Sequence, residues 1–162
     1  MPKSTDLEKF KNSKGLVETN DPESEKPVFR RPGFEDVVNF QEMDRRIASY
    51  LQGAREKAGL SRAEFASMIG LATAVYGRYE RADSRITVTR LIHLCELLDV
   101  MPIDIISEVA PHLYGRTADE AKDYVELTHI IRNLPHETVR DLMGLLRRMT
   151  PENSANDPSS DT

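Results

Sequence analysis

The chain has 162 residues and a formal net charge of −5 at pH 7, a length that suits one compact domain with appendages and excludes large multidomain machinery. Its single cysteine, Cys95, cannot form an intramolecular disulfide, and no apolar run approaches the roughly 20 residues that a membrane-spanning helix needs. Together with the lack of an apolar run of the signal-peptide kind near the N-terminus, these features predict a soluble cytoplasmic protein that does not contact membranes.

The charge is unevenly distributed along the sequence. Between residues 44 and 90 there are nine basic residues and five acidic ones, so this segment is positive while the rest of the chain is negative. Because affinity for nucleic acid depends largely on lysine and arginine side chains that neutralise phosphates, the positive segment is the candidate for a DNA partner.

The two ends of the chain are poor in apolar residues. Residues 1–40 mix charged, polar and proline residues without periodicity, which predicts a flexible, disordered N-terminal arm. Residues 151–162 are acidic and rich in turn-forming residues, which predicts a disordered tail. Between the ends, helical periodicity is dense and the alternation typical of strands is absent, so the predicted fold class is all-α.

Residues 41–110 are predicted to form one domain of five short helices. The first covers residues 41–58 and stops at Gly59; the second starts at Ser61, which has Glu64 at the capping-box spacing, and ends at Gly70. The third covers residues 72–81 and buries Val75 or Tyr76 together with Tyr79, the fourth starts near Thr87, and the fifth follows Pro102.

Residues 111–150 are predicted to form two further amphipathic helices. Thr117 and Glu120 make another capping-box pair that opens the first of them, and Pro135 stands in the first turn of the second. The second helix carries an apolar stripe at helical spacing, formed by Val139, Leu142, Leu146 and Met149. Two helices of this size cannot bury their stripes alone, so they must pack on the first domain, on each other or on a second copy.

Residues 62–81 meet the steric demands of a helix-turn-helix. Two helices that cross steeply need a very small residue where their backbones touch, and Ala66 stands there; the turn needs a residue that tolerates left-handed backbone angles, and Gly70 follows four residues later. Apolar side chains stand at the inward positions before, within and after the turn, namely Phe65, Ile69, Leu71, Tyr76 and Tyr79.

With these features the chain resembles the Xre/Cro/CI family of phage-repressor-type helix-turn-helix regulators. The resemblance covers about residues 47–106 and includes the runs REKAGLSRAEFASMIGL, VYGRYERA and LIHLCELLDVMPIDII. It implies a five-helix lambda-repressor-like DNA-binding domain that is usually dimeric and acts on operators near promoters. The sequence departs from the family at three positions: Arg62 replaces the usual glutamine, Ala72 the usual serine or threonine cap, and Ala82 the usual glycine.

In this geometry the third helix lies in the major groove of double-stranded DNA and presents its outward residues to the bases. Arg78 is the leading candidate, because a guanidinium can donate two hydrogen bonds to guanine O6 and N7. The other expected base-facing residues are Thr73, Ala74 and Gly77, and phosphate or groove-edge contacts are expected from Arg62, Arg81 and Arg85. The resemblance further implies that Arg55 of the first helix pairs with Glu80 and so orients the reading helix.

The sequence shows no motif for a metal site, a phosphate-binding loop or a catalytic nucleophile. The four histidines lie far apart and show no metal-ligand spacing with Cys95, which itself stands on an apolar stripe as expected of a core thiol. No glycine-rich phosphate loop or nucleophile motif occurs. We therefore expect no metal, no cofactor and no enzyme activity.

The sequence thus favours a bacterial or phage-encoded transcription regulator that is cytoplasmic, and nucleoid-associated when bound to its operator. A repressor is the expected kind, and whether transcription is raised or lowered stays open. It is expected to act as a homodimer, with residues 117–149 serving dimerisation or contact with a protein partner. Two alternatives stay open: an antitoxin-like module that binds a toxin and represses its own operon, and an adaptor that kept the fold and lost DNA binding.

Overall fold

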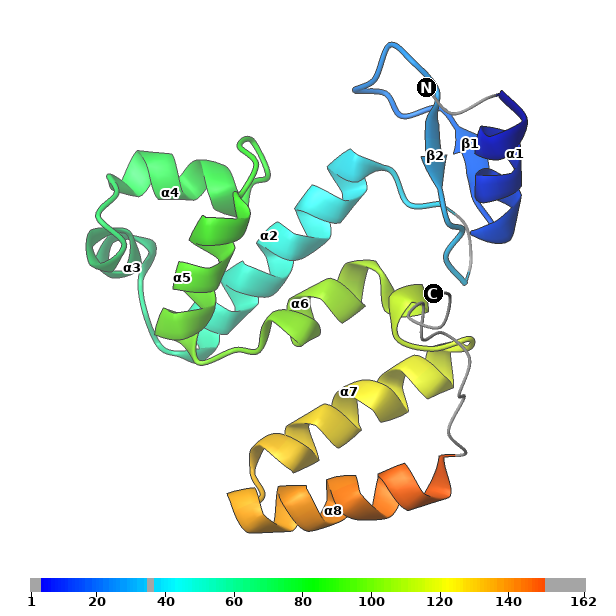
Figure 1. The fold of residues 1–162 in the computed structure, drawn as a ribbon. Helices are drawn as coiled ribbons and strands as arrows, with labels where there is room; N and C mark the ends of the chain where they lie inside the picture. The colour runs from blue at the N-terminus through cyan, green and yellow to red at the C-terminus, as the bar shows by residue number, and fades with distance from the viewer. Residues whose placement is uncertain (1–3, 35–36, 151–162) are drawn as a thin grey trace, which may run out of the picture. The chain divides into compact units, whose positions relative to one another are not determined.

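The computed structural model describes residues 4–34 and 37–150 and is mostly helical, with one small hairpin near the N-terminus (Figure 1). Its elements in chain order are α1 (Ser4–Ser13), β1 (Val17–Thr19), β2 (Val28–Arg30), α2 (Phe40–Lys57), α3 (Arg62–Met68), α4 (Thr73–Glu80), α5 (Val88–Leu98), α6 (Pro102–Val109), the 3₁₀ turn η1 (Pro111–Leu113), α7 (Ala118–Arg132) and α8 (His136–Met149). They divide into two compact units, Met1–Val125 and Glu126–Thr162.

The N-terminal segment corrects the sequence-based prediction. Residues 4–34, expected to be part of a disordered arm in an all-α protein, contain α1 and an antiparallel hairpin in which β1 pairs with β2. Strands of three residues are too short to show an alternating pattern, so periodicity could not predict them. The hairpin is also held by interactions that periodicity does not reveal, such as the Lys11 ammonium 3.9 Å from the centroid of the Phe29 ring.

A buried carboxylate ties this segment to α2. Asp21 is 4% exposed, and its Oδ2 accepts a hydrogen bond from the Phe40 amide at 2.9 Å, while Asn39 Oδ1 accepts from the Glu42 amide. Both bonds satisfy amides that the first turn of a helix leaves unpaired. The start of α2 is therefore capped by its own neighbour and by a residue of the loop between β1 and β2.

The five predicted helices of residues 41–110 are confirmed as α2 to α6, with boundaries within a residue or two of those expected. Ser61 and Glu64 form the predicted capping box at the start of α3, and Thr87 caps α5. Their inward faces form one core, in which the eight buried side chains are Leu51, Phe65, Ala66, Ile69, Tyr76, Leu94, Cys95 and Ile105. Cys95 lies in this core as a free thiol, as its place on an apolar stripe predicted.

The two C-terminal helices are present as α7 and α8. Thr117 Oγ1 accepts from the Glu120 amide, as predicted, but the Glu120 carboxylate accepts from the Arg116 amide, one residue before the expected partner. The predicted disordered tail, residues 151–162, lies outside the described residues. Among the described residues, no helix is long and apolar enough to cross a membrane.

Candidate nucleic-acid interface

The turn between α3 and α4 has the geometry that its sequence predicts. Ala66 is fully buried, Gly70 adopts a left-handed φ of 69°, and the Leu71 amide donates to the Ala66 carbonyl at 2.9 Å. Across the turn the Phe65 and Tyr76 rings pack edge to face with their centroids 5.2 Å apart. These contacts fix how α4 lies against α3.

A contact from outside the motif also secures the turn. The Arg90 guanidinium of α5 donates to the Ile69 carbonyl at 3.1 Å, at the C-terminal end of α3. A cation at this position pairs with a carbonyl that the helix end leaves free. No local spacing relates Arg90 to residue 69, so this contact could not be predicted from the sequence.

One face of α4 is buried and the opposite face is open. Tyr76 is 1% exposed and Tyr79 packs against the core, whereas Thr73, Ala74 and Arg78 are exposed. The sequence predicted that either Val75 or Tyr76 is buried. The structure shows that Tyr76 is buried and Val75 is exposed.

Gly77 does not face outward as predicted. It is buried, and a Cβ added there would lie 3.1 Å from Arg81 Nη1 and 3.5 Å from Arg62 Cδ. The side chains of Arg62 and Arg81 therefore cover this part of α4, and the small size of glycine leaves room for them. Gly77 is therefore the least accessible of the expected base contacts in this structure.

Glu80 lies at the centre of a cluster of charged groups between α2, α3 and α4. Its side chain is 1% exposed, with Oε1 2.5 Å from Arg55 Nε and Oε2 2.7 Å from Arg62 Nε. Arg55 also donates to the Leu60 carbonyl, at the end of the turn that follows α2. The ion pair that the family resemblance implied between Arg55 and Glu80 is present, and Arg62 adds a second cation to it.

The arginines set the protonation of this cluster. Burial by itself would raise the pKa of Glu80, but the hydrogen bonds from Arg55 and Arg62 outweigh burial and hold that pKa below its usual value of 4.5. The nearby Tyr76 hydroxyl is buried without a well-aligned hydrogen bond to a described residue, and its burial and the Glu80 charge raise its pKa. Glu80 is therefore ionised at neutral pH and Tyr76 is not.

The arginines expected to contact DNA differ in how strongly they are already engaged. Arg81 pairs with Asp83 at 2.8 Å, and Arg85 pairs with Asp44 at 3.2 Å and also with Glu23 of the N-terminal segment. Arg78 makes no ion pair with any described residue. Of the expected contacts, Arg78 thus has the guanidinium most available to an outside partner.

A helix-turn-helix family model matches residues 51–105, which run from α2 to α6. These residues are a helix-turn-helix domain of the Xre/Cro/CI type. No curated protein and no solved structure matches the chain. The helix-turn-helix domain indicates a DNA-binding transcriptional regulator, and its motif helices are α3 and α4.

Two of the departures from the family affect the ends of α4 in the helix-turn-helix domain. Ala72 is the N-cap and makes no side-chain capping bond. Ala82 adopts a φ of 56°, the left-handed conformation that glycine accommodates best. The amides of Ala82 and Asp83 donate back to the carbonyls of Tyr79 and Arg78, which is the Schellman pattern at a helix C-terminus.

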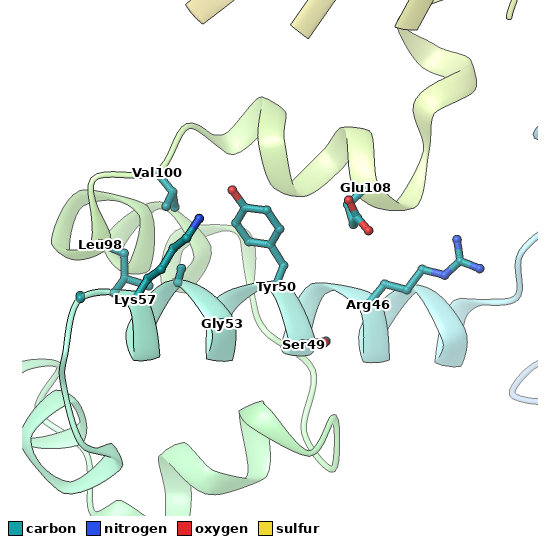
Figure 2. Close-up of a pocket in the computed structure, with 10 residues that line it drawn as sticks. Arg46, Ser49, Tyr50, Gly53, Lys57, Leu98, Val100 and Glu108 are labelled. Atoms are coloured by element: carbon teal, nitrogen blue, oxygen red, sulfur yellow. The ribbon is translucent and has the colours of Figure 1, made fainter. Parts of the chain in front are cut away.

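The helix-turn-helix domain also bears a groove of about 700 Å³ between α2, the end of α5 and α6. Figure 2 shows Tyr50 pointing from α2 toward α6, with Lys57 beside Val100 toward one end and Arg46 toward the other. None of the residues predicted to contact DNA lines this groove. Among the described residues, no cluster of histidine, cysteine or carboxylate side chains could hold a metal ion.

Proposed function

We propose that the chain is a sequence-specific regulator of transcription, a repressor that reads the major groove of double-stranded DNA with α4. The observation that carries the proposal is the exposure of Arg78 on a helix whose opposite face is fixed by buried Tyr76. The Arg78 guanidinium forms no ion pair with a described residue. It can therefore donate to guanine O6 and N7 without first breaking such a pair. No catalytic step is needed for this function.

Thr73 and Ala74 supply further contacts near the N-terminus of α4. Both are exposed, and their methyl groups suit thymine methyls in the major groove. The Thr73 hydroxyl can also bond a base or a phosphate. We propose that these two residues and Arg78 determine the sequence preference.

Arg62, Arg81 and Arg85 are proposed to contact phosphates and so to position the domain without reading sequence. Arg62 binds Glu80 through Nε, and none of the described residues accepts a hydrogen bond from its Nη1 or Nη2. It can therefore hold a phosphate while it remains bound to Glu80. Arg81 and Arg85 must first give up or share their carboxylate partners, so we expect smaller contributions from them.

The test is the titration of labelled genomic fragments with wild type, Arg78→Ala and the control Lys57→Ala. We expect wild type to select particular fragments and Arg78→Ala to lose about 1–3 kcal/mol of that discrimination. Lys57 is exposed and lies beside Val100 at the groove of Figure 2, so its loss changes the charge equally without altering the preferred fragments. Wild type that prefers no fragment even at low salt would instead support the adaptor.

We further propose that residues 41–110 act as the DNA-binding domain and that residues 111–150 serve homodimerisation or contact with a protein partner. The protein is proposed to be cytoplasmic and to join the nucleoid when it is bound to its operator. Support comes from the apolar side chains that the second unit leaves exposed, among them Leu127, Ile130 and Leu146. The same exposure favours a second candidate, the antitoxin-like module. A toxin that copurifies through residues 117–149 and is released by deleting them would favour that candidate.

A further inference from the structure

A second hollow in the first unit differs in chemistry from the groove of Figure 2. It has a volume of about 230 Å³ and is lined by β2 and the segment that follows it, the first half of α2, the end of α6 with η1, and the first residue of α7. Three arginines and a histidine line it, namely Arg30, Arg31, Arg46 and His112. No carboxylate among the described residues lines it.

Among the described residues, no carboxylate pairs with Arg30 or Arg31, and Arg46 shares its carboxylate partner with another arginine. Arg30 is held in place, because it donates to the Val38 carbonyl at 3.1 Å and lies 4.6 Å from the centroid of the Phe40 ring. Arg46 pairs with Glu42 at 3.1 Å, but the same carboxylate also binds Arg45. None of the described residues forms an ion pair with Arg31.

The pKa of His112, the histidine that lines the hollow, responds to these nearby arginines. Burial lowers the pKa of His112, and the positive charges of Arg31 and Arg30 lower it further. A carboxylate beside the imidazole would instead raise its pKa. The His112 imidazole is therefore neutral at pH 7. It can donate or accept one hydrogen bond, and the arginines supply the positive charge for an anion.

The remaining wall is apolar and limits the size of an occupant. Phe34, Val38, Val109 and Pro111 line the hollow together with the cations. Since liquid water occupies about 30 Å³ per molecule, this volume corresponds to roughly eight waters, or an organic molecule of about ten non-hydrogen atoms. Binding sites for such molecules combine an apolar wall with a few polar groups that fix orientation.

We propose that this hollow binds a small organic anion, a carboxylate or phosphate monoester on a compact apolar body. The arginines take the anionic group and the apolar wall takes the body. No residue of α3 or α4 lines the hollow, so the site is separate from the proposed DNA-reading face and does not depend on it. The phosphate group is shared by small molecules and by the DNA backbone, and the experiment must distinguish these two sources.

The experiment is calorimetric titration of the full chain with phenyl phosphate, inorganic phosphate and phenol, while the His112 ring resonances are followed by NMR. We expect saturable binding of phenyl phosphate, weaker binding of inorganic phosphate and none of phenol, with the His112 signals shifting along the same isotherm. Arg31→Gln should weaken phenyl phosphate binding about tenfold, as the loss of a charged hydrogen bond does. The control Lys57→Gln removes an equal charge from the opposite end of α2 and should leave binding unchanged.

Three results would overturn the proposal. The first is no saturable binding of phenyl phosphate, and the second is binding that Arg31→Gln and Lys57→Gln alter equally, because either would deny a defined site. The third is displacement of phenyl phosphate by a short DNA duplex of arbitrary sequence, which would assign the hollow to the DNA backbone. None of these results depends on whether the chain recognises an operator.

Discussion

Glu80 links three helices of the DNA-binding domain through two arginines. Arg55 is 5% exposed and belongs to α2, whereas Arg62 of α3 is 43% exposed in its side chain. The two pairs are therefore unequal: one lies in the protein interior, and the other is partly screened by water. Their inequality leads to two separate predictions.

The first prediction concerns the removal of each member of the buried pair. Glu80→Gln removes the buried counter-ion of the Arg55 guanidinium and leaves it only the exposed Glu56 carboxylate, 3.3 Å away. The variant should cost about 3 kcal/mol of unfolding free energy, the low end of the range for breaking a buried ion pair. Arg55→Met should cost less, because Glu80 keeps Arg62. The double variant should be more stable than Glu80→Gln alone. Urea unfolding followed by circular dichroism measures all three, and equal costs for the two single variants would contradict the assignment of Arg62 to the cluster.

The second prediction concerns acid. The pKa of Glu80 is lowered in the folded chain from 4.5, so the pairing stabilises the fold above pH 4.5 and that stabilisation disappears as the pH falls through the lowered pKa. Arg62→Gln should thus be less stable than wild type at neutral pH and approach wild type as the pH falls below 4.5. Thermal unfolding across this range provides the measurement. A difference that does not change with pH would mean that Arg62 acts by packing alone.

The packing of the helix-turn-helix was predictable from the sequence, but the side-chain partners of its arginines were not. The family resemblance implied the Arg55–Glu80 pair, and the steric pattern correctly predicted a buried Ala66 and a left-handed Gly70. It could not show that Gly77 is covered by arginines, because helical spacing alone leaves residue 77 on the outward face. Nor could it show that Arg85 meets Glu23, since that contact joins segments far apart in the chain.

At the scale of the element, periodicity and capping predicted the helices well because both are local. Ser61 and Thr87 correctly marked the starts of α3 and α5, and Gly59 and Gly70 the ends of α2 and α3. The N-terminal hairpin was not predicted, because it depends on contacts between residues far apart in the sequence. Its strands are short, and buried Asp21 fixes the loop between them by bonding to the Phe40 amide across the chain.

The third prediction concerns the C-terminal end of α4. Ala82 adopts a φ of 56° in the Schellman turn, a conformation that costs an L-residue about 1–2 kcal/mol relative to glycine. Glycine loses more backbone entropy on folding, so Ala82→Gly should stabilise the domain by a smaller net amount, about 1 kcal/mol. Ala82→Val should destabilise it. Chemical denaturation tests both variants, and a stabilising valine would show that the turn is not strained.

At the scale of the whole molecule, the two units differ in how they are stabilised. The first has a buried core around Phe65, Tyr76 and Leu94. In the second, no described residue falls in the buried class, and large apolar side chains such as Leu145, Leu146 and Met149 are 46–70% exposed. Exposed apolar surface concentrated in this way is typical of an interface, so we expect the second unit to be completed by another chain.

The fourth prediction assigns that chain to a second copy. Val139, Leu142, Leu146 and Met149 recur at alternating spacings of three and four residues, the pattern with which helices pack against each other. Leu146→Glu places a charge in the middle of this stripe and should convert a homodimer into a monomer. DNA affinity should then fall, because a dimer contacts two half-sites and a monomer only one. Analytical ultracentrifugation and fragment titration measure the two effects.

The matched control for Leu146→Glu is Gly144→Glu, which adds the same charge two residues earlier on the opposite face of α8. A Cβ at Gly144 meets nothing within 4 Å, so the variant is accommodated without strain. It should remain dimeric and bind DNA as wild type does. If wild type is itself monomeric at concentrations where it binds its operator, the stripe is covered by a different protein. In that case the antitoxin-like function, in which a toxin covers this stripe, becomes the better interpretation of α8.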